Sequence, residues 1–553
     1  MTPDESHPRA GAAGTWSRIC PADRLAPGRP VAIKVQDRQL ALFLHEGTVF
    51  ACDNRCPHEG YPLVEGSLGA DCVLTCHWHN WKFDLKTGET RYGGDALRIY
   101  PSQLRDGAVW LDLHDPPVAE QVVVALRHLG EAMGKMDVDR IARELARLDL
   151  LGAGPVIAVA SAIDSSFARL PDGMSHAYAA ADAWLRLRDM GTDPAQRLAC
   201  AGEAIAYIAW DCLREPDRPF ADSREPWSPD AFAQAIESQD ETRAAALING
   251  ALAGGMHLAD LEPALARSAL AHYNDFGHSL IYLQHVRGLV ERIGAEAEKP
   301  LLLAWMRSVV LATREDLLPD FRAYADALAS WRAPGTVPAA PVNADAFEGR
   351  TVRQALAATL AVRACAPLDV YFGLLEAGAR HLLRFDESLA FRTENAVPDN
   401  VGWLDFSHAI TFGHAVRMQC ERIPSLWPQG LLQLALFVGR NAKFLDPALT
   451  SRDAIGRWEV QDEAAFDESA RARIVDHGIG LPIFPAHWLK TWLAVRDEID
   501  LGVPPALRRT LLAATRRLLA VRFKQRHPLR DAHQALRFVG TRANEPTGSP
   551  PTG

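Results

Sequence analysis

The sequence lacks the features that define several large classes of protein. No apolar run approaches the ~18 residues needed to span a bilayer, and the longest run, near residues 431–438, is far shorter. The first residues, MTPDESHPRAGAAG, lack the basic stretch and apolar core of a secretory signal. A net charge of −10 argues against a general nucleic-acid binder. We therefore expect a cytoplasmic protein that binds neither a membrane nor nucleic acid.

Cysteine is scarce, and its distribution is uneven. Nine cysteines in 553 residues are too few for a disulfide scaffold. Four of them nevertheless lie between positions 52 and 76, together with His58, His77 and His79. This local crowding of thiols and imidazoles indicates a metal site.

The residue pattern changes once along the chain. Residues 14–113 contain short β-branched and aromatic runs separated by Gly and Pro, which predict a small all-β domain. From residue 118 onward, Ala/Leu/Arg stretches with helical periodicity dominate. The Pro/Gly/Ala-rich stretch 331–347 divides this second part. We therefore expect a multidomain chain whose large, mostly α-helical domain has two halves, residues 118–330 and 345–540.

The two helical halves share two sequence frames. The frame H-x3-F-G-H occurs at residues 272–278 and again at 408–414. The frame A-G-x-x-H-L lies upstream of each, at residues 253–258 and 377–382. Since both frames recur in the same order, the sequence predicts an internal duplication.

The crowded N-terminal region contains the motif C-x-H-x17-C-x2-H, formed by Cys56, His58, Cys76 and His79. Two thiolates and two imidazoles bind either a Zn²⁺ ion or a [2Fe–2S] cluster with Cys₂ on one iron and His₂ on the other. The spacing alone leaves both groups open.

The wider run CPHEGYPLVEGSLGADCVLTCHWHNWKFDLKTGE resembles a Rieske [2Fe–2S] domain of the bacterial ferredoxin and oxygenase type. The resemblance implies that Cys56 and Cys76 ligate the inner iron, and that His58 and His79 ligate the outer, solvent-facing iron. Asn80 stands where the family usually has Gly, and Asn is the residue after Gly that best tolerates a positive φ. We therefore expect the turn that contains Asn80 to form in spite of this substitution.

A Rieske domain transfers single electrons and does not itself transform a substrate. The helical region should therefore contain either the site that accepts these electrons or a surface on which another protein docks. Classical Rieske oxygenases bind catalytic iron with a D-x2-H-x4-H element, whereas this chain has D-x2-H-x5-H at residues 405–414 in a helical context. The classical catalytic domain is therefore not expected. Six histidines at equivalent places in the two repeats could instead hold non-haem iron, mononuclear or dinuclear: His257, His272, His278, His381, His408 and His414. His176, His477 and His487 are lone histidines, which we expect to be ordinary hydrogen-bonded or packing residues.

The spacing of the H-x3-F-G-H frame limits this hypothesis. Residues six apart lie ~120° away from a common face of a straight helix. Both histidines of one frame can reach one metal only if the helix breaks near Gly277 or Gly413.

These features predict an oxidoreductase, an O₂-dependent oxygenase of a small organic substrate. No nucleotide or flavin motif is evident, so an external reductase or a ferredoxin-type donor would supply the electrons. Three alternatives stay open. The helical domain could bind haem, act on a substrate without a metal, or serve as the docking module of a non-catalytic electron carrier.

Overall fold

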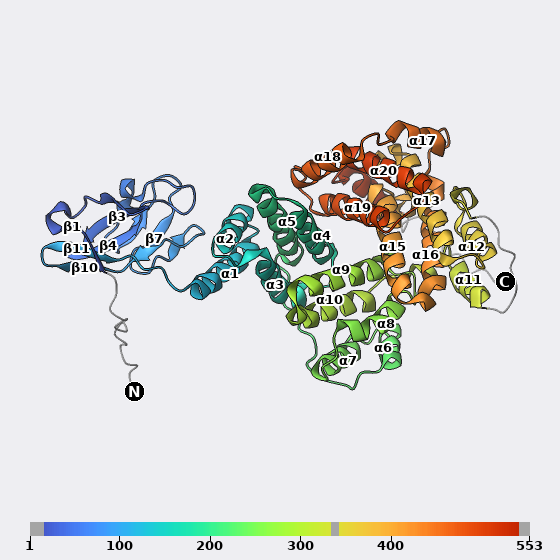
Figure 1. Ribbon diagram of the computed structural model, residues 1–553, viewed down its shortest axis with the longest axis horizontal. Coiled ribbons are helices and arrows are strands. Elements are labelled where there is room, and N and C mark those ends of the chain that lie inside the picture. Colours follow the sequence, from blue (N-terminus) through green and yellow to red (C-terminus); the bar gives the residue numbers. More distant parts are fainter. Residues whose placement is uncertain (1–15, 333–341, 541–553) are drawn as a thin grey trace. The chain divides into compact units, whose positions relative to one another are not determined.

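The computed structural model describes residues 16–332 and 342–540, and its contacts divide the chain into two compact units between Ala153 and Gly154. Figure 1 shows the first unit in blue to teal and the second from green to red. The division lies beyond the boundary expected near residue 118. The helices α1 (Val118–Lys135) and α2 (Val138–Leu150) therefore group with the β-rich domain.

The β-rich domain consists of short antiparallel strands in three sheets. The sheet orders are β1-β11-β10, β2-β3-β4-β9 and β5-β6-β7-β8. The strands are β1 (Trp16–Pro21), β2 (Val31–Val35), β3 (Arg38–His45), β4 (Thr48–Asp53), β5 (Ser67–Leu68), β6 (Val73–Thr75), β7 (Lys82–Asp84), β8 (Thr90–Tyr92), β9 (Ile99–Tyr100), β10 (Ser102–Arg105) and β11 (Ala108–Asp112).

Strand β3 separates two hydrophobic cores. Successive side chains of a strand point to opposite faces, so Leu40 and Leu42 pack into one core. Ala41 and Phe43 pack into the other, which also contains the cysteines of the metal motif. The alternation of this strand thus places the candidate metal site on one defined side of the sheet.

A buried ion network holds the α1–α2 hairpin against the β-rich domain. Asp95 is fully buried and accepts hydrogen bonds from Arg143 at 2.8 Å and from Arg147 at 3.1 Å. Arg140 lies 3.7 Å from the same carboxylate. Because all three arginines are on α2, one aspartate fixes the hairpin to the domain, which explains why the two helices group with it.

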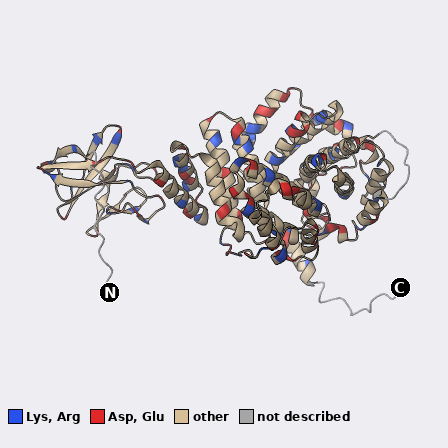
Figure 2. Cartoon of the chain, turned by 60° about the horizontal axis from the view of Figure 1, so that its bottom comes forward, with Lys and Arg blue, Asp and Glu red and all other residues tan. Residues whose placement is uncertain are grey.

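The second unit is helical in its described part. Its helices are α3 (Gly154–Ser166), α4 (His176–Met190), α5 (Pro194–Cys212), α6 (Pro229–Glu237), α7 (Glu241–Ala253), α8 (Leu258–Ala269), α9 (His278–Ile293), α10 (Glu298–Val310), α11 (Ala323–Arg332), α12 (Val352–Ala361), α13 (Pro367–Arg384), α14 (Ser388–Phe391), α15 (Trp403–Arg422), α16 (Trp427–Asn441), α17 (Ser451–Trp458), α18 (Glu463–Val475), α19 (Ile483–Asp500), α20 (Pro505–Ala520) and α21 (Pro528–Gly540). Acidic and basic residues are interspersed along them (Figure 2). In the part of the chain that the structure describes, no helix is both long and apolar enough to cross a membrane.

Four of these helices form a closed ring of contacts. Helix α4 packs against α9, α9 against α15, α15 against α19, and α19 against α4. Two of the four precede the stretch 331–347 and two follow it, and most of that stretch lies outside the described residues. The two sides of the expected division therefore interlock through these helices.

The structure does not show the expected internal duplication, because the shared frames fold differently. The first H-x3-F-G-H frame is broken: Asp275, Phe276 and Gly277 all have positive φ, and His278 begins α9. The second frame lies inside the continuous helix α15. The first A-G-x-x-H-L frame likewise crosses from α7 to α8, whereas the second lies within α13.

Candidate functional site

The two halves of the Cys/His motif form matching turns. The backbone N–H of Cys56 donates to the carbonyl of Tyr61, and that of Cys76 donates to the carbonyl of Trp81, both at 2.8 Å. Four residues after each cysteine the backbone is left-handed, with φ of 80° at Gly60 and 60° at Asn80. Asn80 thus adopts the conformation that the sequence required of it.

The donor atoms of this motif face one another. Cys56 and Cys76 are buried in the same core cluster, and the rings of His58 and His79 lie 4.6 Å apart. Nδ1 of His58 is buried without a hydrogen-bond partner, although the ring is fixed by stacking on Trp81 at 4.4 Å. Burial raises the pKa of the Cys56 thiol to about 11, so a bound cation would be needed to hold it as a thiolate.

This donor set fits a [2Fe–2S] cluster with mixed ligands. Two buried thiols supply the cysteine side, and two imidazoles supply the histidine side. His79 is 40% exposed in its side chain and His58 is 24% exposed, so the histidine side faces solvent. The unpartnered Nδ1 of His58 is the polar atom that an iron ligand bond would satisfy.

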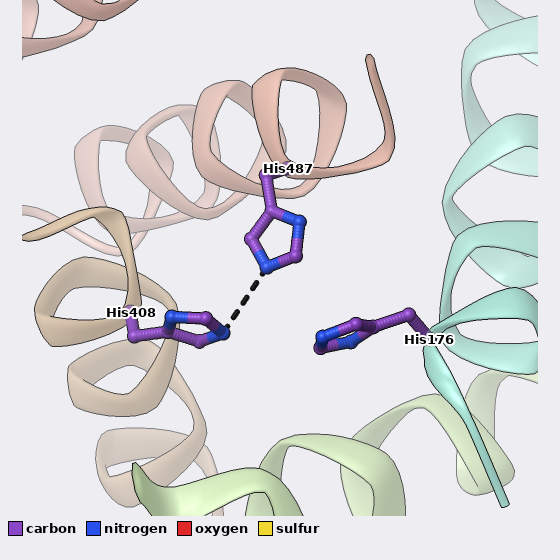
Figure 3. Close-up of side chains that lie close together, drawn as sticks. All are labelled: His176, His408 and His487. Atoms are coloured by element: carbon purple, nitrogen blue, oxygen red, sulfur yellow. Dashed lines mark hydrogen bonds between the residues drawn. The ribbon is translucent and has the colours of Figure 1, made fainter. Parts of the chain in front are cut away.

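The helical unit brings together four histidines, which we call the four-histidine site: His176, His278, His408 and His487. Nε2 of His408 lies 2.8 Å from Nε2 of His278 and 3.1 Å from Nε2 of His487. The ring of His176 lies 4.6 Å from the rings of both His278 and His487. Each residue comes from a different helix of the α4–α9–α15–α19 ring, and Figure 3 shows three of them pointing into one space.

The tautomers of three of these rings are fixed by backbone carbonyls. Nδ1 of His408 donates to the carbonyl of Leu404 at 2.6 Å, and Nδ1 of His487 donates to that of Ile483 at 2.7 Å. Nδ1 of His278 is held in the same way by the carbonyl of Asp275. A neutral imidazole with its proton on Nδ1 has only a lone pair on Nε2. The lone pair on Nε2 of His408 therefore lies about 3 Å from those of His278 and His487.

The surroundings of the four-histidine site disfavour extra protons on it. Burial lowers the pKa of His278 to about 3, and burial also lowers the pKa values of the other three histidines. Lys490 Nζ lies 3.3 Å from Nδ1 of His176, and Tyr282 Oη lies 3.2 Å from the same atom. Burial lowers the pKa of Lys490 to about 7.

The structure brings together only two of the six histidines singled out in the sequence, His278 and His408. His257 caps α8 and bonds Glu298, and His272 lies between Asp316 and Glu237. His381 accepts a hydrogen bond from the backbone of Gly349, and His414 pairs with Glu498 and Asp497. The rings of these four histidines therefore contact other partners and do not belong to the four-histidine site.

Sequence reasoning missed His176 and His487. His176 is the first residue of α4, directly after its N-cap Ser175, and His487 lies in the second turn of α19. Neither belongs to a repeated frame, so no local pattern separates them from packing residues. In the described part of the helical unit, only one group of three or more candidate ligands is close enough to hold a metal ion, and it consists of His176, His408 and His487. His278 adjoins this group through His408. The second ion of a dinuclear centre therefore has no comparable group there.

Comparisons with known proteins agree on the first unit. The family description "Rieske [2Fe-2S] domain" matches residues 15–101. The ferredoxin component of an alkene monooxygenase system from Xanthobacter autotrophicus is 32% identical over 100 residues, which are 18% of this chain and 82% of that protein. A 4beta-methylsterol monooxygenase from Methylococcus capsulatus is 31% identical over 123 residues, 20% of this chain and 33% of that protein.

A solved ferredoxin from Sphingomonas yanoikuyae B1 is 29% identical and covers 18% of this chain and 98% of its own, with a TM-score of 0.17. The relatives thus include both electron-transfer components and a monooxygenase. The family match ends at residue 101 and leaves the helical unit outside it. Through its N-terminal domain, the chain belongs to the Rieske [2Fe–2S] family.

Proposed function

We propose that this protein is an oxidoreductase in which the Rieske domain supplies electrons to one iron ion at the four-histidine site. The iron would activate O₂ for the oxidation of a small organic molecule. The proposed ligands are His176, His408 and His487, whose nitrogens form one close group, together with His278, which adjoins that group through His408. Relatives of the Rieske domain that are components of oxygenase systems support this direction of electron flow.

The observation that carries the proposal is the convergence of unprotonated nitrogens. A neutral imidazole whose Nδ1 donates to a carbonyl has no Nε2 proton to share with a second imidazole of the same kind. Without a cation, the contacts of His408 at 2.8 and 3.1 Å would set lone pairs against lone pairs. A metal ion with nitrogen ligands at ~2.1 Å and bond angles near 90° separates adjacent nitrogens by about 3.0 Å. The two separations measured from His408 match this value.

Iron is favoured by the chemistry of the electron donor. Imidazole binds Fe, Cu, Ni and Zn well, but Zn²⁺ has no redox chemistry. A domain that delivers single electrons requires a metal that accepts them. The carbonyl bonds to Nδ1 are the contacts that orient metal-binding histidines and increase their basicity.

The haem alternative finds no support in this geometry. A haem with two axial imidazoles holds their nitrogens on opposite faces of the macrocycle. Nε2 atoms separated by 2.8 and 3.1 Å leave no space for a ring between them.

We infer no reductase site on the chain itself, because no nucleotide or flavin motif is evident in the sequence. A separate reductase or ferredoxin-type donor would therefore reduce the cluster.

Metal content tests the proposal directly. Wild-type protein should contain three irons per chain, two in the cluster and one in the helical unit. Replacing His408 and His487 by Ala should lower this number to two and leave the EPR signal of the cluster unchanged. His381→Ala is the matched control, since it also removes a buried histidine but should retain three irons.

Two results would contradict the proposal. The first is a wild-type protein with two irons and no other transition metal. The second is equal O₂ consumption, with reductant and reductase supplied, by the wild type and the His408→Ala/His487→Ala variant. The second result would favour a non-catalytic electron carrier.

A further inference from the structure

A cavity of about 680 Å³ in the helical unit reaches the four-histidine site. His278 lines it, and so does Tyr282, whose hydroxyl lies beside His176. Its volume is within the range of 300–1,000 Å³ that small-molecule pockets occupy. An organic molecule in this cavity would therefore lie against a proposed metal ligand.

A second cavity, of about 590 Å³, approaches the site through Lys490 and Thr411, which contact His176 and His408. None of the four histidines lines it. Its walls carry several arginines paired with carboxylates, for example Arg186 with Asp497. The first cavity is thus the one that exposes a ligand of the site.

The walls of the first cavity combine apolar surface with carboxyl groups. Leu170, Met174, Phe276 and Leu318 contribute apolar side chains. The same walls include four acidic residues, Asp172, Asp211, Asp275 and Glu315, and no lysine or arginine among the residues that the structure describes. An anion entering this cavity would lose its hydration without meeting a positively charged side chain.

The partners of these carboxyl groups are neutral. Asp211 accepts a hydrogen bond from Ser175 Oγ at 2.6 Å, and Asp275 accepts one from the backbone N–H of Thr313 at 2.9 Å. Burial without a nearby cation raises the pKa of Asp211 to about 6 and that of Glu315 to about 8. Carboxyl oxygens in such surroundings are suited to hydrogen bonds with the hydroxyl groups of a ligand.

One wall of the cavity is a strained segment that also positions the metal ligand. Asp275, Phe276 and Gly277 are consecutive left-handed residues, with φ of 42°, 51° and 83°. Such conformations are strained in non-glycine residues and persist only where surrounding contacts impose them. Two backbone bonds impose this one: Asp275 N–H donates to Thr313 O, and Glu315 N–H donates to Tyr273 O, both at 3.0 Å. The cavity wall and His278 are therefore set by the same structure.

We propose that this cavity is the substrate chamber and that it takes an uncharged, hydroxyl-bearing organic molecule while excluding carboxylates, phosphates and sulfonates. The inference rests on the proposed function, because it places the substrate beside the iron of the four-histidine site. The apolar walls bind the body of the molecule, and the carboxyl groups accept its hydroxyl hydrogens. The four carboxyl groups of the lining set the discrimination against anions, since no described residue of that lining supplies a cationic side chain to offset them.

A pair of probes with the same ring system tests this selectivity. Binding of 2-naphthol and of 2-naphthoate to the full-length, iron-loaded protein is measured by calorimetry near neutral pH. We expect 2-naphthol to bind at least about tenfold more tightly, because only the naphthoate carries a negative charge into the acidic chamber. Asp211→Asn should reduce this difference in affinity by improving the binding of naphthoate.

Two methionine variants locate the binding. Met174 lines the chamber and Met418 lines the other cavity, so Met174→Trp should abolish the binding of 2-naphthol and Met418→Trp should not. Equal binding of the two probes, binding of neither, or loss of binding only in Met418→Trp would overturn the assignment. The iron content of the same samples separates the two proposals. Two irons with Met174-dependent binding of 2-naphthol would refute the metal site alone, and three irons without selectivity would refute the chamber alone.

Discussion

Gly277 and Gly413 occupy the same place in the repeated H-x3-F-G-H frame, and we expect opposite responses to replacement by alanine. Gly277 has φ of 83°, and a Cβ added there would lie 2.2 Å from Cδ2 of Phe412. Phe412 is fully buried and packs against Phe437, so its ring has little room to move. Gly413 lies within α15, where the nearest atom to an added Cβ is the end of the Leu375 side chain, at 3.0 Å.

The structure gives the size of each effect. A left-handed alanine costs about 1–2 kcal/mol, and forcing a methyl group into a packed core costs about 1–3 kcal/mol. Gly277→Ala should therefore lower the free energy of unfolding by about 2–5 kcal/mol. In Gly413→Ala, the helix propensity of alanine contributes about 1 kcal/mol and offsets the tight contact with Leu375, while the contacts with Leu434 and Tyr371 at 3.8 Å are of ordinary van der Waals length. That variant should stay within about 1 kcal/mol of the wild type.

Urea titration followed by far-UV circular dichroism measures both variants, and iron analysis supplies a second readout. Gly277→Ala should also lose the third iron, because the break at this glycine places His278 at the start of α9. Gly413→Ala should keep it. Equal destabilisation of the two variants, or a Gly277→Ala protein with wild-type stability and iron content, would refute the reasoning from the broken frame.

Three further predictions concern charge and thiol chemistry. Hydrogen bonds to carboxylates raise the pKa of His272, so its contribution to stability is fully present below the unfolded value of about 6.5 and fades as the pH rises through the folded pKa. The melting temperature of the wild type should therefore fall as the pH rises through this range, and His272→Gln should lose this pH dependence. An unchanged pH dependence in the variant would contradict the assignment. Asp95→Asn leaves the buried Arg140 and the partly exposed Arg143 and Arg147 without their shared counter-charge and should destabilise the first unit by about 3–5 kcal/mol, measured as earlier thermal bleaching of the cluster. Unchanged bleaching would exclude the anchor role. Cys52→Ala should retain the visible spectrum of the cluster, since Cys52 is a buried core residue, whereas Cys56→Ser should lose it.

The Rieske domain could be predicted from the sequence because its information is local. The four ligands lie within 24 residues, between Cys56 and His79, and two short turns bring them together. The left-handed position at Asn80 could also be anticipated, since few residues other than Gly accept that conformation. The change from strand-like to helical periodicity near residue 118 likewise reports local backbone structure.

The tertiary structure decided which distant histidines meet. His278 and His408 are 130 residues apart, and His408 and His487 are 79 apart. Their convergence depends on how four helices pack in a ring, which no spacing within one helix encodes. A repeated frame shows that two segments share a local sequence, but it does not show that they occupy equivalent positions in the fold. For that reason His414, which matches His278 in the frame, pairs with Glu498, whereas His487, which matches nothing, completes the site.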